Sequence, residues 1–214
     1  MAATSTPDLQ GLLNEHPLSK HLRSQDADAF TTDSVLEIPE AHRAETFTTG
    51  TCEAFFARPP AVLVSRKAKT ILAVYFLGPG FMGHRGIVHG GVLATLLDEC
   101  CGGAAMCHFE ATPRAKEALN STKDDSANTP EFRSGAATVQ LSLSFLAPVP
   151  TSSCIIVQAT VDDGDVAQSS SSSRKIRVVA KLWSLPAFRA QDDVLCVKAQ
   201  SIFIKPKGNR GAAL

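Results

Sequence analysis

The chain has 214 residues, of which 44% are hydrophobic, enough for one domain with a sizeable core. Lys and Arg together number 21, and so do Asp and Glu, so the formal net charge is zero. This balance argues against nucleic acid or an anionic membrane as the main partner, because both attract strongly basic surfaces. An anionic small ligand would have to be held by a local basic cluster.

The sequence predicts neither export nor a metal site. Residues 1–25 contain no apolar run of signal-peptide length, and Asp8 and Glu15 argue against a transit peptide. No apolar stretch approaches the roughly 20 residues that span a bilayer. The six cysteines form no C-x-x-C pair and are interpreted as reduced, while His84 and His89 lack a third ligand at suitable spacing. We therefore expect a cytoplasmic protein without a metal or cofactor, with an organellar address left open.

Residues 1–47 are predicted to form a helical lead-in. Leucines at positions 9, 12 and 13 have helical spacing until Pro17 interrupts the pattern. The expected role of this segment is to cover part of the core of the following domain.

The main domain is predicted to span residues 48–207, with a tail at 208–214. Its first strand is TILAVYFL, which ends at a Gly-Pro-Gly turn. A polar, Pro-interrupted surface insertion is expected at about residues 110–135. Four further strands follow in TVQLSLSF, CIIVQATV, RKIRVVAKLWSL and VLCVKAQSIFIK, with a serine-rich insert between the second and third.

Between the first strand and the insertion lies the most informative segment, GIVHGGVLATLLDECCGGAAMCHF. It is apolar on nearly every face, with Asp98 and Glu99 as the charges of its middle part. Such a helix is expected to be buried. Gly102 and Gly103 weaken an isolated helix by about 1 kcal/mol each but allow close packing on a sheet.

One strand, one long helix and four consecutive strands define an α+β pattern. Consecutive strands joined by short connections are expected to be antiparallel neighbours. A single buried helix needs apolar cover, which a curved antiparallel sheet wrapped around it supplies. The pattern therefore predicts the hotdog fold.

The segment GIVHGGVLATLLDE resembles the motif of hotdog-fold thioesterases of the phenylacetyl-CoA (PaaI) type. Asp98 stands nine positions after His89, as in that family, and the strand TVQLSLSFLAP is similar to the family's strand after the helix. The resemblance covers roughly residues 70–205. It implies hydrolysis of acyl-CoA thioesters to a free acid and CoA, in a homodimer or a dimer of dimers.

The resemblance also implies roles for individual residues. Asp98 takes the place of the catalytic carboxylate, and the Gly90 N–H that of the oxyanion donor, with His89 orienting the turn. Thr138 matches a hydroxyl residue that faces the carboxylate across the dimer interface in relatives. A hydroxyl placed there could hold a water for attack on the thioester, although direct attack by Asp98 stays open.

Substrate binding is predicted at two places. Gly91 lets a substrate approach the helix start closely, and Arg174 with Lys175 resembles a Gly-Arg-Lys sequence near the CoA phosphates. Two departures from the family pattern stand out, because Ser173 replaces the glycine of that sequence and Gly83 replaces an asparagine found in many relatives.

Spacing along the helix predicts how the site is assembled. At 1.5 Å per residue, Asp98 lies about 13 Å from His89 along the axis, too far for both to reach one carbonyl. A dimer with antiparallel helices would bring Gly90 of one copy toward Asp98 of the other.

Other interpretations of the same residues remain. His89 and Asp98 also supply the residue types of a hotdog hydratase or dehydratase, and the missing asparagine keeps a non-catalytic acyl-CoA-binding module open. Asp98 could be a structural hydrogen-bonding residue, and Arg174 with Lys175 a solvated strand end. The acyl group, and the choice between CoA and an acyl-carrier protein, are not predicted.

Overall fold

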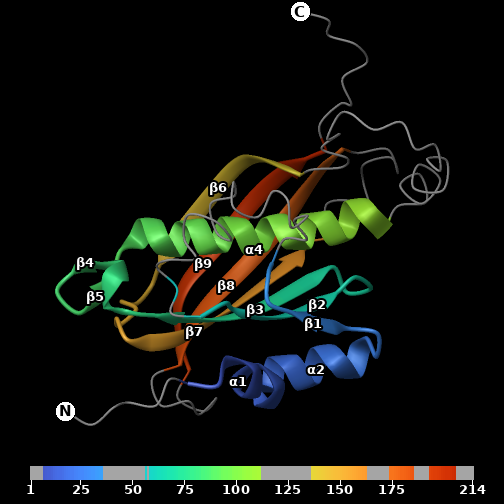
Figure 1. The fold of residues 1–214 in the computed structure, drawn as a ribbon. Coiled ribbons are helices and arrows are strands. Elements are labelled where there is room, and N and C mark those ends of the chain that lie inside the picture. Colours follow the sequence, from blue (N-terminus) through green and yellow to red (C-terminus); the bar gives the residue numbers. More distant parts are fainter. Residues whose placement is uncertain are drawn as a thin grey trace, which may run out of the picture.

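A computed structural model describes residues 7–35, 56, 58–111, 136–162, 174–185 and 193–205. It contains one large antiparallel sheet and one long helix packed against it (Figure 1). The elements follow in the order α1 (Leu9–Glu15), α2 (Pro17–Gln25), β1 (Phe30–Thr32), β2 (Ala61–Ser65), β3 (Thr70–Leu77), η2 (Pro79–Phe81), β4 (Met82–His84), β5 (Ile87–Val88), α4 (Gly90–Ala111), β6 (Ala137–Phe145), β7 (Ser153–Val161), β8 (Lys175–Leu185) and β9 (Val194–Ile204).

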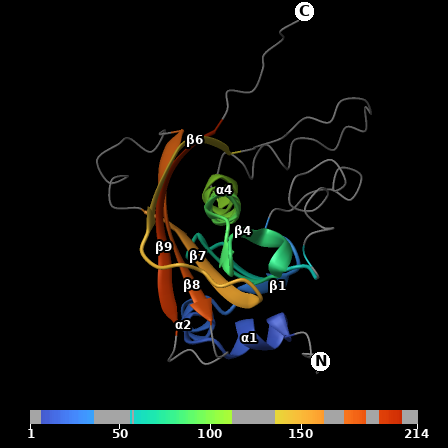
Figure 2. The ribbon, with the colours of Figure 1, turned by 90° about the vertical axis from the view of Figure 1, so that its left-hand side faces the viewer.

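The sheet curves around α4, which gives the predicted hotdog fold (Figure 2). The side of α4 that faces the sheet is buried and apolar, and it packs on β3, β7, β8 and β9. The opposite side is not fully covered, since Asp98, Glu99, Gly102 and Met106 remain partly exposed. The helix thus has one buried side and one partly open side in a single chain.

The strand order corrects one expectation. The seven strands lie in the order β1-β2-β3-β7-β8-β9-β6, so β6 pairs with β9 at the edge and not with its successor β7. The connection from β6 to β7 crosses the end of the sheet instead of making a tight turn. Its backbone groups bond along the way to Cys196, Val88, Gly86 and Leu77.

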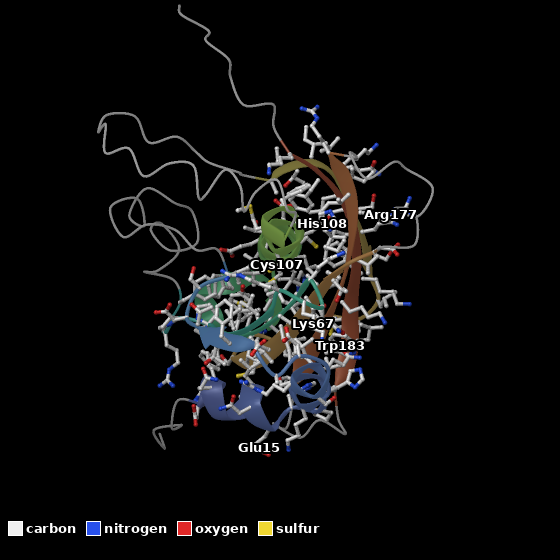
Figure 3. The ribbon with its side chains drawn as sticks, turned by 90° about the vertical axis from the view of Figure 1, so that its right-hand side faces the viewer. Glu15, Lys67, Cys107, His108, Arg177 and Trp183 are labelled. Atoms are coloured by element: carbon white, nitrogen blue, oxygen red, sulfur yellow. The ribbon has the colours of Figure 1, made fainter. Side chains whose placement is uncertain are left out.

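Helices α1 and α2 lie on the face of the sheet opposite to α4 (Figures 1 and 2). Leu9, Leu13 and Leu22 are buried there in a second apolar cluster with residues of β2, β3 and β7. Trp183 of β8 packs against this cluster (Figure 3). Helices α1 and α2 thus cover one face of the sheet.

Two contacts fix the lead-in to the rest of the domain. His16 accepts a hydrogen bond from the Leu18 N–H, which caps α2, and its Nε2 lies 2.8 Å from the Asp193 carboxylate at the start of β9. Strand β1, which the sequence did not predict, pairs with β2 through the register Phe30 to Val64. The lead-in therefore also extends the sheet.

Several predictions fall outside the described residues, namely most of the 110–135 insertion, the serine-rich insert, the 208–214 tail and Cys52. The other five cysteines are free and buried. Within the described ranges, no helix is long and apolar enough to cross a membrane.

The two adjacent glycines of α4 have different surroundings. A Cβ added at Gly103 would lie 2.9 Å from the Val35 side chain and 3.0 Å from the Val35 carbonyl oxygen. Among the described residues, a Cβ added at Gly102 would meet only the ring of Phe203, at an ordinary 3.7 Å. The close packing expected of this pair is therefore a property of Gly103.

Opposite effects on stability are expected from the two alanine substitutions. Gly102→Ala should raise the free energy of unfolding by about 0.5–1 kcal/mol, because the helix gains a better helix former whose methyl group makes only an ordinary contact with Phe203. Gly103→Ala should lower it by about 1–3 kcal/mol through overpacking against Val35. Urea unfolding of both variants measures the difference, and equal shifts would contradict it.

Candidate active site

The start of α4 is held by His89. Its backbone N–H donates to the Phe81 carbonyl at 2.8 Å, and its Nδ1 accepts a hydrogen bond from the Gly91 N–H at 2.9 Å. The His89 carbonyl accepts from the Val92 N–H, which begins the helix. No hydrogen bond within the described residues uses the Gly90 N–H. His89 thus shapes the turn and leaves one backbone donor available at the positive end of a 22-residue helix.

Gly83 and Gly91 lack the side chains that would collide with His89 in this position. A Cβ at Gly91 would lie 3.0 Å from the imidazole, and a Cβ at Gly83 would lie 2.7 Å from the His89 Cα. The second contact is with backbone, so no side chain fits at position 83 without movement of the chain. The asparagine that many relatives carry there is therefore incompatible with this hairpin geometry.

Asp98 lies on the partly open side of α4 and is half-buried. The Thr138 hydroxyl donates to its carboxylate, with Oγ1 at 3.1 Å from Oδ1 and 3.3 Å from Oδ2. Burial raises the pKa of the Asp98 carboxyl above its ordinary value, and the Thr138 hydrogen bond partly opposes this by stabilising the anion. The site thus holds a carboxylate that is more basic than an exposed one.

A β-bulge aims Thr138 at Asp98. The register of β6 on β9 shifts between Thr138 and Gln140, so that Thr138 pairs with buried Phe203 while Gln140 pairs with Ile202. Strict alternation would have placed Thr138 on the same side as Gln140, away from the helix. Bulges commonly redirect a side chain in this way.

The Thr138 contact corrects two expectations. The hydroxyl and the carboxylate belong to the same chain and do not face each other across a dimer interface. They also touch directly, so no water lies between them, and Thr138 holds the carboxylate itself.

Asp98 and Gly90 are far apart within one chain. Asp98 stands eight positions after Gly90 in one continuous helix, a rise of about 12 Å. Each is instead close to a different end of β6, because Thr138 at the start touches Asp98 and the Phe145 ring at the end lies 3.4 Å from where a Gly90 Cβ would be. The chain therefore carries the two halves of the predicted site at separate places.

Arg174 and Lys175 lie at the end of the sheet that carries Thr138. Ile204 of β9 pairs with both Lys175 and Ala137, which places Lys175 two strands away from the start of β6. Lys175 is exposed, and Arg177, two residues further along β8, lies on the outer side of the sheet (Figure 3). The structure does not bring these cations into contact with Asp98.

One further basic residue joins this end of the sheet. The Lys205 N–H bonds to the Arg174 carbonyl at 2.8 Å. Sequence reasoning did not select Lys205, although a lysine directly after the last strand was the available signal.

The Cys101 thiol near Asp98 is not a nucleophile at neutral pH. Burial raises the pKa of the Cys101 thiol to about 12, and the nearby Asp98 charge adds to this, so the thiol stays protonated. In the part of the chain that the structure describes, no three His, Cys, Asp or Glu side chains cluster as metal ligands would.

The fold and this helix-start motif define a hotdog-fold protein, and comparison with known families agrees. Residues 85–163, which contain His89, Asp98 and Thr138, match the family described as the thioesterase superfamily. A mitochondrial protein of Candida albicans (strain WO-1), itself uncharacterized, is 22% identical over 148 residues, 69% of this chain. The match covers 53% of that protein, so the chain spans about half the length of this relative.

One solved structure shows the same fold, and a second is similar over part of the chain. Zebrafish thioesterase superfamily member 2 superposes with a TM-score of 0.51 at 12% identity, over 77% of this chain and 91% of that one. An acyl-CoA hydrolase from Staphylococcus aureus, solved with butyryl-CoA and CoA, gives a TM-score of 0.48 at 18% identity, over 67% of this chain and 70% of that one.

Proposed function

We propose that this protein hydrolyses acyl-CoA thioesters to a free acid and CoA. The observation that carries the proposal is that one chain holds both a half-buried Asp98, bonded by Thr138, and an available Gly90 N–H at a helix start. The match of residues 85–163 to the thioesterase superfamily supports the same reaction class. No cofactor is required for this chemistry.

Gly90 and Asp98, the two halves of the site, each meet one requirement of thioester cleavage. Negative charge develops on the carbonyl oxygen, and the Gly90 N–H, together with the helix dipole, would stabilise it by an amount worth about 10²–10³ in kcat. The Asp98 carboxylate would activate water or attack the carbonyl carbon itself. His89 positions the donor through its bond to Gly91.

We propose that the two halves meet in a homodimer. Strand β6 is one of the two edges of the described sheet, and its Val139 and Phe145 are 56% and 54% exposed. Exposed apolar edge strands are favourable sites for pairing with a second copy. Antiparallel pairing of two β6 strands centred near Leu141 would bring the Thr138 end of one copy beside the Phe145 end of the other. Asp98 of one chain would then approach Gly90 of its partner.

The direct test is to incubate the purified protein with an acyl-CoA and a thiol reagent. Release of free CoA is expected. A change at the double bond of an enoyl-CoA without CoA release would instead identify a hydratase, and binding without turnover a non-catalytic module. Either of these results would overturn the proposed hydrolysis.

Thr138→Val should lower kcat by about 5–30-fold, since a carboxylate-holding hydrogen bond is worth about 1–2 kcal/mol. It should also shift the acid limb of the kcat/KM profile to higher pH. The reason is that the hydroxyl lowers the pKa of Asp98, so its removal lets burial raise that pKa further.

Thr138→Ser is the matched control, because it keeps the hydroxyl. It should retain most of the activity and the wild-type pH profile. Unchanged kinetics in Thr138→Val would show that Thr138 is a strand residue without a role at the carboxylate.

A further inference from the structure

The packing of the described residues does not require a glycine at position 102. It lies in the interior of α4, where glycine weakens a helix by about 1 kcal/mol relative to alanine. Its neighbour Gly103 is explained by Val35, which packs where a side chain would be. Among the described residues, a Cβ at Gly102 would meet only Phe203 within 4 Å, so the packing of these residues gives no reason for the missing side chain.

The position of Gly102 relative to Asp98 suggests a reason. The two residues are four apart in the helix and therefore occupy the same face, one turn from each other. Both are partly exposed, and Met106, one turn further on, is partly exposed as well. In a single chain, the surface that runs from the carboxylate toward the C-terminal end of α4 is thus partly open, and Gly102 and Met106 bring no charge to it.

The part of the sheet behind this surface is apolar. Phe203 pairs with Thr138, the residue that holds Asp98, and its ring lies 3.7 Å from where the Gly102 Cβ would be. The ring is buried and packs against the helix at Gly102. An extended apolar group that starts at Asp98 would pass over Gly102, where the helix has no side chain and the buried ring lies behind it.

We propose that Gly102 is the specificity-determining residue for the acyl group, which lies along α4 from Asp98 over Gly102 toward Met106. The substrate class is then an extended aliphatic acyl thioester. In Figure 3 this direction leads toward the end of α4 where Cys107 and His108 are labelled. The inference rests on the proposed hydrolysis and adds to it the direction and nature of the acyl group.

The test measures kcat/KM for acetyl-, butyryl-, octanoyl- and palmitoyl-CoA in the wild-type protein, Gly102→Leu and Ala94→Leu. Wild type should prefer the longer chains. Gly102→Leu should lower kcat/KM for octanoyl-CoA by about 10-fold or more while acetyl-CoA changes little, because a few methylenes of lost space have such effects in apolar sites. Gly102→Ala should show a smaller shift in the same direction.

Ala94→Leu is the matched control. Ala94 lies one turn from Asp98 in the opposite direction and is also partly exposed, so the same bulk is added on the other side. Its chain-length preference should stay that of the wild type. A shift in Ala94→Leu but not in Gly102→Leu would overturn the proposed direction, and wild-type preference for acetyl-CoA would overturn the substrate class.

Binding separates this inference from the proposed reaction. Calorimetric titration of the Asp98→Asn protein with octanoyl-CoA and with CoA alone should show that the acyl chain adds affinity, and that Gly102→Leu removes about 10-fold or more of it. If the wild-type protein releases no CoA but this binding difference is found, the proposed hydrolysis is wrong and the proposed acyl site is supported. If CoA is released and octanoyl-CoA binds equally with glycine or leucine at position 102, the inference about Gly102 is wrong.

Discussion

Asp98→Asn is expected to reduce kcat by about 10²–10⁴-fold, the usual contribution of a catalytic carboxylate acting on a proton. The amide has nearly the same shape and can still accept the Thr138 hydrogen bond, but it can neither take up a proton nor attack a carbonyl. Steady-state hydrolysis of an acyl-CoA measures the loss. A variant that keeps more than about a tenth of the wild-type kcat would contradict the assignment.

Stability of the same variant distinguishes a catalytic from a structural aspartate. Burial raises the pKa of Asp98 in the folded protein, so its protonated form favours the fold and this contribution is lost as pH rises through the folded pKa. At neutral pH the ionised carboxylate is therefore a cost that Asp98→Asn does not carry. Thermal unfolding at pH 7 should show a Tm equal to or above that of the wild type, and a clearly lower Tm would indicate a structural role.

The fold could be predicted because each of its main elements has a recognisable pattern of apolar residues in a short stretch of the sequence. An apolar segment with helical length and four alternating strands indicate a helix packed in a curved sheet. The position of β6 could not be predicted in this way, since hydrogen bonds of residues 146–152 with Cys196, Val88 and Leu77 carry the chain across the sheet end. Strand pairing at this distance leaves no signature in the local sequence.

The candidate site was predictable to a different degree at each residue. The distance between His89 and Asp98 along the helix follows from helix geometry, so it could be calculated from the sequence. The contact of Thr138 with Asp98 depends on a bulge of one residue, and alternation alone predicts the opposite face. The resemblance placed this contact between two chains, whereas the structure places it within one.

Two inactive variants should restore activity to each other if Asp98 and Gly90 act from different chains. Gly90→Pro removes the backbone N–H, and proline is favoured at the first position of a helix, where that N–H has no helical partner. The only positive φ among described glycines is at Gly86, so the φ angle of Gly90 is no obstacle. Gly90→Pro alone should lose about 10²–10³ in kcat, whereas Gly90→Ala, which keeps the N–H beside Phe145, should remain active.

Refolding a 1:1 mixture of Asp98→Asn and Gly90→Pro chains should give about a quarter of the wild-type activity. Random pairing makes half of the dimers mixed, and each mixed dimer joins the intact Gly90 of one chain to the intact Asp98 of the other at one of its two sites. Chains that carry both substitutions, mixed 1:1 with wild type, provide the control, because no mixed dimer then has an intact site and activity should again fall to about a quarter. If both residues act within one chain, the first mixture stays inactive and the second keeps about half of the activity, since every wild-type chain then works alone.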